Sequence, residues 1–305
     1  MKKAIIAIIA VIILVPLIIF FGFPGVLYNF STNKARKSAK LTKKSIKVGT
    51  HTVSYLDGGK GEVILCLHGL GGDKDNWSAM AKHVTPKFRV VALDLPGNGE
   101  SSKNVTEMYT YTAQVERLSS IIKALKLSKF HIISHDMGGP IAVKYTIKNP
   151  AKVLSLALLG SQGVKAPQRS NHSKLLSKGK NTLAPNNVKE FDKLLKFLFI
   201  KPPSIPGPVK KYLLKKAIKA RAFNTKIFFD VFGEDYFMNN DLGKIRQKTL
   251  VIWGDTDNIT HISSVGILKK GLKNKKAVIM KDVGHLPMRQ KPDETAKLYL
   301  DFLNK

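Results

Sequence analysis

Cysteine and acidic residues are scarce in this 305-residue chain. The single cysteine, Cys66, excludes an intramolecular disulfide framework. It lies in the apolar run Val63–Leu67, where a buried and unreactive thiol is expected. The sequence also has no cluster with metal-ligand spacing and no glycine-rich phosphate loop of the expected pattern. We therefore expect neither a metal nor a cofactor.

The shortage of acidic residues gives the chain a large positive charge. Only 21 Asp and Glu stand against 51 Lys and Arg, for a formal net charge of +30. The lysines are spread along the chain without a nucleic-acid-binding motif, so no nucleic-acid partner is expected. One interpretation of the charge is attraction to an anionic membrane surface, where each nearby lysine contributes about 1 kcal/mol of binding free energy. The simplest interpretation is that the source proteome is rich in lysine and that these lysines lie on solvated faces of the protein.

One long hydrophobic run is present, at the N-terminus. Residues Ala4–Phe23 are almost uninterrupted apolar residues after Lys2 and Lys3. About 20 such residues cross a bilayer as a helix, and Pro16 is tolerated in such a helix. A cleaved signal peptide has a shorter apolar region of about 7–15 residues and a small-residue cleavage site. Neither feature is present, so the sequence predicts an uncleaved single-pass transmembrane anchor over residues 1–30.

A basic stretch follows the predicted anchor. It carries seven lysine and arginine residues between Lys34 and Lys47, and we interpret residues 31–49 as a basic linker. The positive-inside rule then favours a cytoplasmic catalytic domain. A short basic start is also typical of an exported signal anchor, so the side of the membrane stays open.

From residue 50 to residue 305 the pattern alternates short apolar runs with helical segments. Continuous apolar runs suit strands that are buried on both faces of a mostly parallel sheet. Strand and helix alternation predicts a three-layer α/β fold. The expected strands are Thr52–Leu56, Val63–Leu67, Arg89–Leu93, Phe130–Ser134, Leu154–Leu159, Leu250–Trp253 and Ala277–Met280. Residues 161–246 interrupt the alternation with helical segments alone, and we interpret them as a helical cap insertion.

The segment Ser134–Gly139, with the sequence Ser-His-Asp-Met-Gly-Gly, follows an apolar strand and precedes a helix. A nucleophile at such a strand–turn–helix elbow needs small neighbours, because the strand and the helix pack closely there. Ser134 and Gly138 are small, and Asp136 stands where serine is usual. In the alternative interpretation Asp136 caps the following helix in an ordinary loop.

Two later motifs favour catalysis. Asp257 follows a buried strand, with Asp255 as the nearby alternative acid, and His285 follows the next strand. The chain order nucleophile, acid, histidine predicts a triad of Asp136, Asp257 and His285. The loop after the strand Val63–Leu67 would supply the amide of Leu70 to an oxyanion hole, and Met137 would supply the other amide. We expect His68 in that loop to be structural.

These motifs resemble the α/β-hydrolase superfamily over residues 50–305. The region of Trp77, the segment Phe197–Pro208 and the segment Asn224–Val231 look like the lipase-3 and monoacylglycerol-lipase branch, whose members often carry an N-terminal membrane anchor. The elbow is similar instead to epoxide hydrolases and dehalogenases, which use aspartate. Leu70-Gly71 departs from the epoxide hydrolase His-Gly-x-Pro signature, and Met137 departs from the Asp-Trp pair of haloalkane dehalogenases.

An aspartate nucleophile favours attack on an sp3 carbon. Such an attack gives a stable alkyl-enzyme ester and divides a difficult displacement into two steps. His285, oriented by Asp257, would then activate water against that ester. Epoxide opening also needs an acid, which the resemblance places on cap tyrosines, and Tyr212 and Tyr236 are the candidates. Surface packing is the alternative for both.

Three functions remain after this reasoning. The first is hydrolysis of a lipophilic epoxide or carbon–halogen bond through a covalent intermediate on Asp136. The second is a lipase or esterase of the monoacylglycerol-lipase type. The third is an inactive scaffold of that branch. The expected partners are a lipophilic small-molecule substrate and the membrane, contacted through the N-terminal helix.

Overall fold

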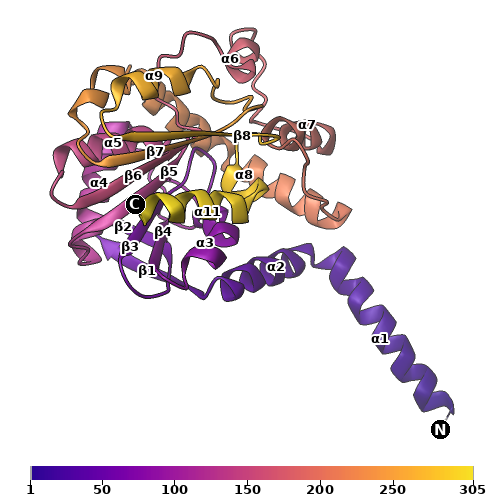
Figure 1. Cartoon of the computed structure of the whole chain (residues 1–305). Coiled ribbons are helices and arrows are strands. Elements are labelled where there is room, and N and C mark those ends of the chain that lie inside the picture. Colours follow the sequence, from indigo (N-terminus) through magenta and orange to yellow (C-terminus); the bar gives the residue numbers. More distant parts are fainter. Residues whose placement is uncertain (1, 305) are drawn as a thin grey trace.

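The computed structural model describes residues 2–304, which form a central sheet with helices on both faces (Figure 1). The strands are β1 (Leu41–Val48), β2 (His51–Gly58), β3 (Val63–Leu67), β4 (Arg89–Leu93), β5 (Phe130–His135), β6 (Val153–Leu159), β7 (Lys248–Gly254) and β8 (Lys275–Met280). The helices are α1 (Lys2–Gly22), α2 (Pro24–Ser38), α3 (Ser78–Val84), α4 (Tyr111–Ala124), α5 (Gly138–Lys148), α6 (Asn171–Leu176), α7 (Val188–Leu198), α8 (Gly207–Gly233), α9 (Ser264–Gly271), α10 (Pro287–Gln290) and α11 (Pro292–Leu303).

The sheet runs in the order β1-β2-β4-β3-β5-β6-β7-β8. Strands β3 to β8 pair in parallel, whereas β2 is antiparallel to both β1 and β4. The carboxyl ends of β5, β7 and β8 therefore lie at one edge of the sheet, which is where α/β sheets place their sites. The predicted three-layer α/β fold is confirmed.

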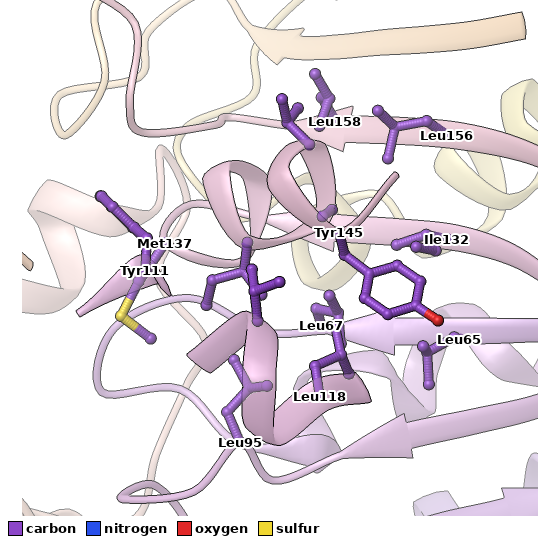
Figure 2. Close-up of a cluster of buried hydrophobic side chains, with 14 of the residues drawn as sticks. Leu65, Leu67, Leu95, Tyr111, Leu118, Ile132, Met137, Tyr145, Leu156 and Leu158 are labelled. Atoms are coloured by element: carbon purple, nitrogen blue, oxygen red, sulfur yellow. The ribbon is translucent and has the colours of Figure 1, made fainter. Parts of the chain in front are cut away.

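Two apolar clusters fill the space between the sheet and its helices. Side chains alternate along each strand, so Leu65 and Leu67 of β3 join one cluster and Ile64 and Cys66 join the other. The first cluster lies against α4, α5 and α9, and Figure 2 shows part of it around Tyr145 and Leu118. The second lies against α3 and α11. Both faces are buried, which explains the continuous apolar runs in the sequence.

The structure differs from the sequence prediction between residues 31 and 49. Instead of a basic linker, α2 continues to Ser38 and residues 41–48 form the edge strand β1. Its side chains are mostly exposed, and Lys43 and Lys44 lie on it. Lysine is common on edge strands because it discourages pairing with other chains. The polar pattern of β1 therefore hid a strand that belongs to the sheet.

Helices α6, α7 and α8 lie between β6 and β7, in the segment that we interpret as the cap, and no strand occurs there among the described residues. Helix α8, with 27 residues, crosses much of this segment and ends at Gly233. Hydrogen bonds join its C-terminal half to the loop before α4, where Tyr109 N donates to Asp230 Oδ2 at 2.8 Å. This contact fixes α8 beside the body of the protein.

Helix α1 extends away from the folded domain, whereas α2 packs against α3, β1 and α8 (Figure 1). The chain turns at Phe23, immediately before Pro24 at the start of α2, as expected since the residue before proline avoids helical geometry. Within the described residues, α1 and α2 meet the requirements of a membrane span only as a pair, Leu14–Gly22 with Pro24–Ser38, and this pair is bent by 92°. The single-pass helix predicted over residues 1–30 is not confirmed.

Candidate active site

Asp136 lies at the turn between β5 and α5. Its φ of 51° is in the left-handed region, which costs a residue with a side chain and is characteristic of a nucleophile elbow. The neighbouring loop can approach closely because it offers glycine: a Cβ at Gly69 would lie 2.5 Å from the Asp136 carboxylate. A Cβ at Gly138 would similarly lie 2.6 Å from the Leu67 carbonyl oxygen. The small residues of the two motifs thus hold a strained turn against the end of β3.

The two carboxylate oxygens of Asp136 have different surroundings. Oδ2 accepts a hydrogen bond from Leu70 N at 2.9 Å, so it occupies the predicted oxyanion hole. The amide of Met137, the other predicted donor, also favours the charged carboxylate. Oδ1 is buried and has no hydrogen-bond partner among residues 2–304. It lies 3.7 Å from His285 Nε2, so the predicted nucleophile presents this oxygen to the predicted base.

His285 lies between two carboxylates. Its Nδ1 is 2.9 Å from Asp257 Oδ2, and its Nε2 faces Asp136. Asp257 itself is fixed by three further donors, because its Oδ1 accepts from Ile259 N and Thr260 N and its Oδ2 accepts from Thr260 Oγ1 at 2.7 Å. The structure therefore brings together all three predicted triad residues, in the geometry that orients a histidine as a base.

Burial and charge both act on the site. Burial raises the pKa of Asp136 above its usual value, although His285 and the amides of Leu70 and Met137 oppose that rise. Burial by itself lowers the pKa of His285, but Asp257 and Asp136 overcome this and raise it. An imidazolium at His285 is thus stabilised when a proton reaches it.

Three contacts around His285 were not foreseen from the sequence. His135 Nε2 donates to the His285 carbonyl oxygen at 2.8 Å, and the two rings lie 4.4 Å apart. Burial lowers the pKa of His135 well below its usual value, so its ring stays neutral. The Leu198 carbonyl at the end of α7 accepts from His285 N at 3.0 Å. The only sequence signal for these contacts was the position of His135 immediately before Asp136 in the elbow segment.

Asn258, which follows the triad acid, joins the same loop to the cap helices. Its Nδ2 donates to the Phe197 carbonyl at 3.3 Å, and its Oδ1 accepts from Asn171 Nδ2 at 2.7 Å. The His172 amide donates to its carbonyl at 2.9 Å. Both α6 and α7 are therefore attached directly to catalytic loops.

The two tyrosines proposed as cap acids have other partners. The Tyr212 ring packs against Gly25 and lies 5.7 Å from the Tyr28 ring, so it contacts α2 and is not brought to the triad. The Tyr236 hydroxyl donates to Asp241 Oδ2 at 2.9 Å. Both tyrosines thus have neighbours that a helical pattern does not reveal, and their role as cap acids stays a prediction.

Other residues near the motifs have structural roles. His68 Nδ1 donates to the Gly69 carbonyl at 2.7 Å while its Nε2 accepts from Leu95 N at 3.0 Å, which is a neutral and fully bonded ring. Asp255 accepts from Asp282 N and Val283 N and so braces the loop before His285. Neither side chain forms a hydrogen bond with the carboxylate of Asp136.

Comparison with known proteins identifies the family. A family described as alpha/beta hydrolase fold matches residues 62–200. Lipase 1 of Psychrobacter immobilis is 32% identical over 272 residues, which are 88% of this chain and 86% of that protein. The chain is an α/β-hydrolase.

Two further relatives refine the comparison. Monoacylglycerol lipase ABHD6 of Bos taurus is 28% identical over 254 residues, 79% of this chain and 74% of that protein. The crystal structure of a membrane phospholipase A, described as a novel bacterial virulence factor, superposes with a TM-score of 0.91 at 36% identity. It covers 100% of this chain and 98% of its own. The α/β-hydrolase therefore resembles lipid-ester hydrolases more than the epoxide hydrolases and dehalogenases that Asp136 indicates.

Proposed function

We propose that this α/β-hydrolase is a membrane-associated lipid hydrolase that cleaves a carboxylic ester. The observation that carries the proposal is the 36% identity to a membrane phospholipase A over the whole chain, with the N-terminal helices included. The lipase and monoacylglycerol lipase relatives support the same substrate class. The apolar residues of α1, many of them exposed, support contact with lipid.

Ester cleavage can be written with the groups at the site. Asp136 Oδ1 attacks the ester carbonyl carbon, the carbon–oxygen bond to the alcohol breaks, and His285 in its protonated form gives that alcohol its proton. The acyl group is then held as an anhydride on Asp136. Neutral His285 next removes a proton from water, which attacks the anhydride and releases the acid. Asp136 is again a carboxylate and His285 is again protonated.

A second candidate function is favoured by the position of Asp136 Oδ2. That oxygen accepts the Leu70 amide, which an ester substrate would need for its own carbonyl oxygen. In an alkyl-enzyme ester formed from an epoxide or a halide, Oδ2 would be the carbonyl oxygen and would stay at Leu70. Oδ1 would form the new bond to the sp3 carbon as the bond from that carbon to the halide or to the epoxide oxygen breaks. The halide would leave as an anion, whereas the epoxide oxygen would take a proton from protonated His285. His285-activated water would then attack Cγ of Asp136.

The experiment compares the natural protein with Asp136→Ser on an acylglycerol, a fatty epoxide and a haloalkane. Lipid-ester hydrolysis predicts acylglycerol turnover by the natural protein and equal or faster turnover by the serine variant, since serine suits the oxyanion hole. The second candidate predicts epoxide or halide turnover that the serine variant loses. If the natural protein cleaves nothing while Asp136→Ser cleaves esters, both functions are refuted in favour of an inactive scaffold.

Oxygen-18 water separates the mechanisms further. In a single turnover with enzyme in excess, attack on an sp3 carbon gives an alcohol whose new oxygen comes from Asp136, and the label enters Asp136. Direct attack by water labels the product at once and leaves Asp136 unlabelled. That second result would exclude Asp136 as the nucleophile for these substrates.

A further inference from the structure

The outer face of α8 carries a continuous stripe of exposed side chains. Alternating steps of four and three residues place the stripe on one side of the helix. Its members are Lys211, Lys215, Ile218, Ala222, Thr225, Phe229 and Phe232. Lysines occupy the N-terminal part, whereas Phe229 and Phe232 are 63% and 74% exposed at the C-terminal end. Large aromatic side chains rarely stay this exposed without a partner.

The inner face of the same helix lies over the catalytic loops. Leu214, Ile227 and Val231 are buried. The side-chain nitrogen Nδ2 of Asn224 lies close to Gly71, in the loop that carries Leu70: a Cβ added at Gly71 would be 3.3 Å from it. Phe229 is only five residues from Asn224, which is about 8 Å along the axis. The exposed aromatic end is therefore close to the oxyanion loop.

The loop before α4 extends the apolar end of the stripe. Val105 and Met108 are 72% and 56% exposed. Tyr109, the next residue, holds this loop to α8, because its backbone N donates to Asp230 Oδ2 at 2.8 Å. We call Val105, Met108, Phe229 and Phe232 the aromatic tip.

The charges on α8 point to an anionic partner. The helix contains seven lysine and arginine residues and one aspartate. Within residues 2–304, Lys211, Lys215 and Lys219 form no ion pair. The N-terminal half of α8 also contacts α2, where Lys216 Nζ lies 4.6 Å from the centre of the Tyr28 ring. The stripe thus begins beside the helix that follows the apolar α1.

We propose that the outer face of α8 docks on an anionic lipid bilayer. The aromatic tip enters the interface between headgroups and acyl chains, and Lys211 and Lys215 bind lipid phosphates. Lys219, exposed beside the stripe, adds to the positive charge. This combination of lysines and aromatic residues on one helix face is what interfacial helices use. The docking would place the Leu70–Gly71 loop, which lies beside Asn224 of α8, near the lipid, whichever bond Asp136 chemistry breaks.

A fluorescent probe on a single cysteine tests the proposal on the full chain. Cys66 is buried and burial raises the pKa of its thiol, so a maleimide probe reacts at an introduced cysteine alone. Phe232→Cys carries an environment-sensitive probe at the aromatic tip. Lys273→Cys is the matched control, since it is exposed just before β8, at the opposite edge of the sheet from Asp136. Both are reconstituted in vesicles of phosphatidylcholine with or without phosphatidylglycerol.

We expect the probe at position 232 to shift to the blue in vesicles with phosphatidylglycerol and to be quenched several-fold by brominated acyl chains. The control should show neither effect, and Lys211→Glu with Lys215→Glu should weaken both. Equal emission at the two positions would overturn the proposal. So would a blue shift that lipid quenchers do not reach, because a contact between two copies of the chain would produce it. These readouts need no turnover, so they stand apart from the proposed activity.

Discussion

Asp136 and Asp257 are two buried aspartates at the same edge of the sheet with opposite surroundings. Asp257 receives the backbone amides of Ile259 and Thr260, the Thr260 hydroxyl and His285 Nδ1. Asp136 Oδ2 receives Leu70 N, and its Oδ1 receives no hydrogen bond from any described residue. A carboxylate with all its lone pairs engaged is held in place, whereas one with a bare oxygen remains nucleophilic. The difference supports the proposed roles, in which Asp257 orients His285 and Asp136 forms the bond to the substrate.

The largest effect should come from removing the base between them. His285→Gln keeps the size of the side chain but cannot take a proton from water, so turnover should fall by about 10²–10⁴-fold. With an epoxide or halide substrate, Asp136 would still be alkylated and the adduct would persist. Intact-mass spectrometry after substrate addition measures that adduct. Rapid multiple turnover by the variant would contradict the role of His285.

An effect of comparable size should follow from weakening the support of His285 by Asp257. Asp257→Asn should lower kcat by roughly 10³–10⁴-fold, because the amide can hold the wrong histidine tautomer. Thr260→Val removes a single hydrogen-bond donor to Asp257. It should raise the activation barrier by only about 1 kcal/mol and so lower kcat about fivefold. Asp255→Asn is the matched control, since that side chain braces a loop and does not touch His285. A loss at Asp255 as large as that at Asp257 would reverse the assignment of the acid.

The sequence allowed the sheet to be predicted because its strands are buried on both faces. Strands β3 and β4 begin and end at the predicted residues, and only the edge strand β1, with its lysines, was missed. The helices outside the sheet were harder to foresee. The extent of α8 depends on which surfaces it contacts, and local patterns do not carry that information. The turn at Phe23, by contrast, follows from the local Phe23-Pro24 sequence.

The site was partly visible for a different reason. Strand ends in a parallel sheet meet at one edge, so the chain order of Asp136, Asp257 and His285 was enough to bring them together in the prediction. The contacts that fix them were not visible. The Leu198 carbonyl that receives His285 N is a backbone group, and Tyr212 turned to α2 instead of the site. Such contacts follow from tertiary packing.

The smallest predicted effect concerns stability. Burial raises the pKa of Asp136, so the ionised carboxylate costs folding free energy as the pH rises through that raised value, and the cost is absent below the unfolded pKa near 3.8. His285 offsets the cost while it is protonated, and since its pKa is raised this help is lost only above about pH 6.5. Asp136→Asn should therefore raise Tm most at pH 8–9 and hardly at all at pH 4. Each 1 kcal/mol gained in the free energy of unfolding would raise Tm by about 2–4 °C. Scanning calorimetry of this variant and of Asp301→Asn, which changes an exposed acid on α11, measures the difference. An equal rise in Tm at both pH values would show that the ionised carboxylate of Asp136 does not destabilise the fold.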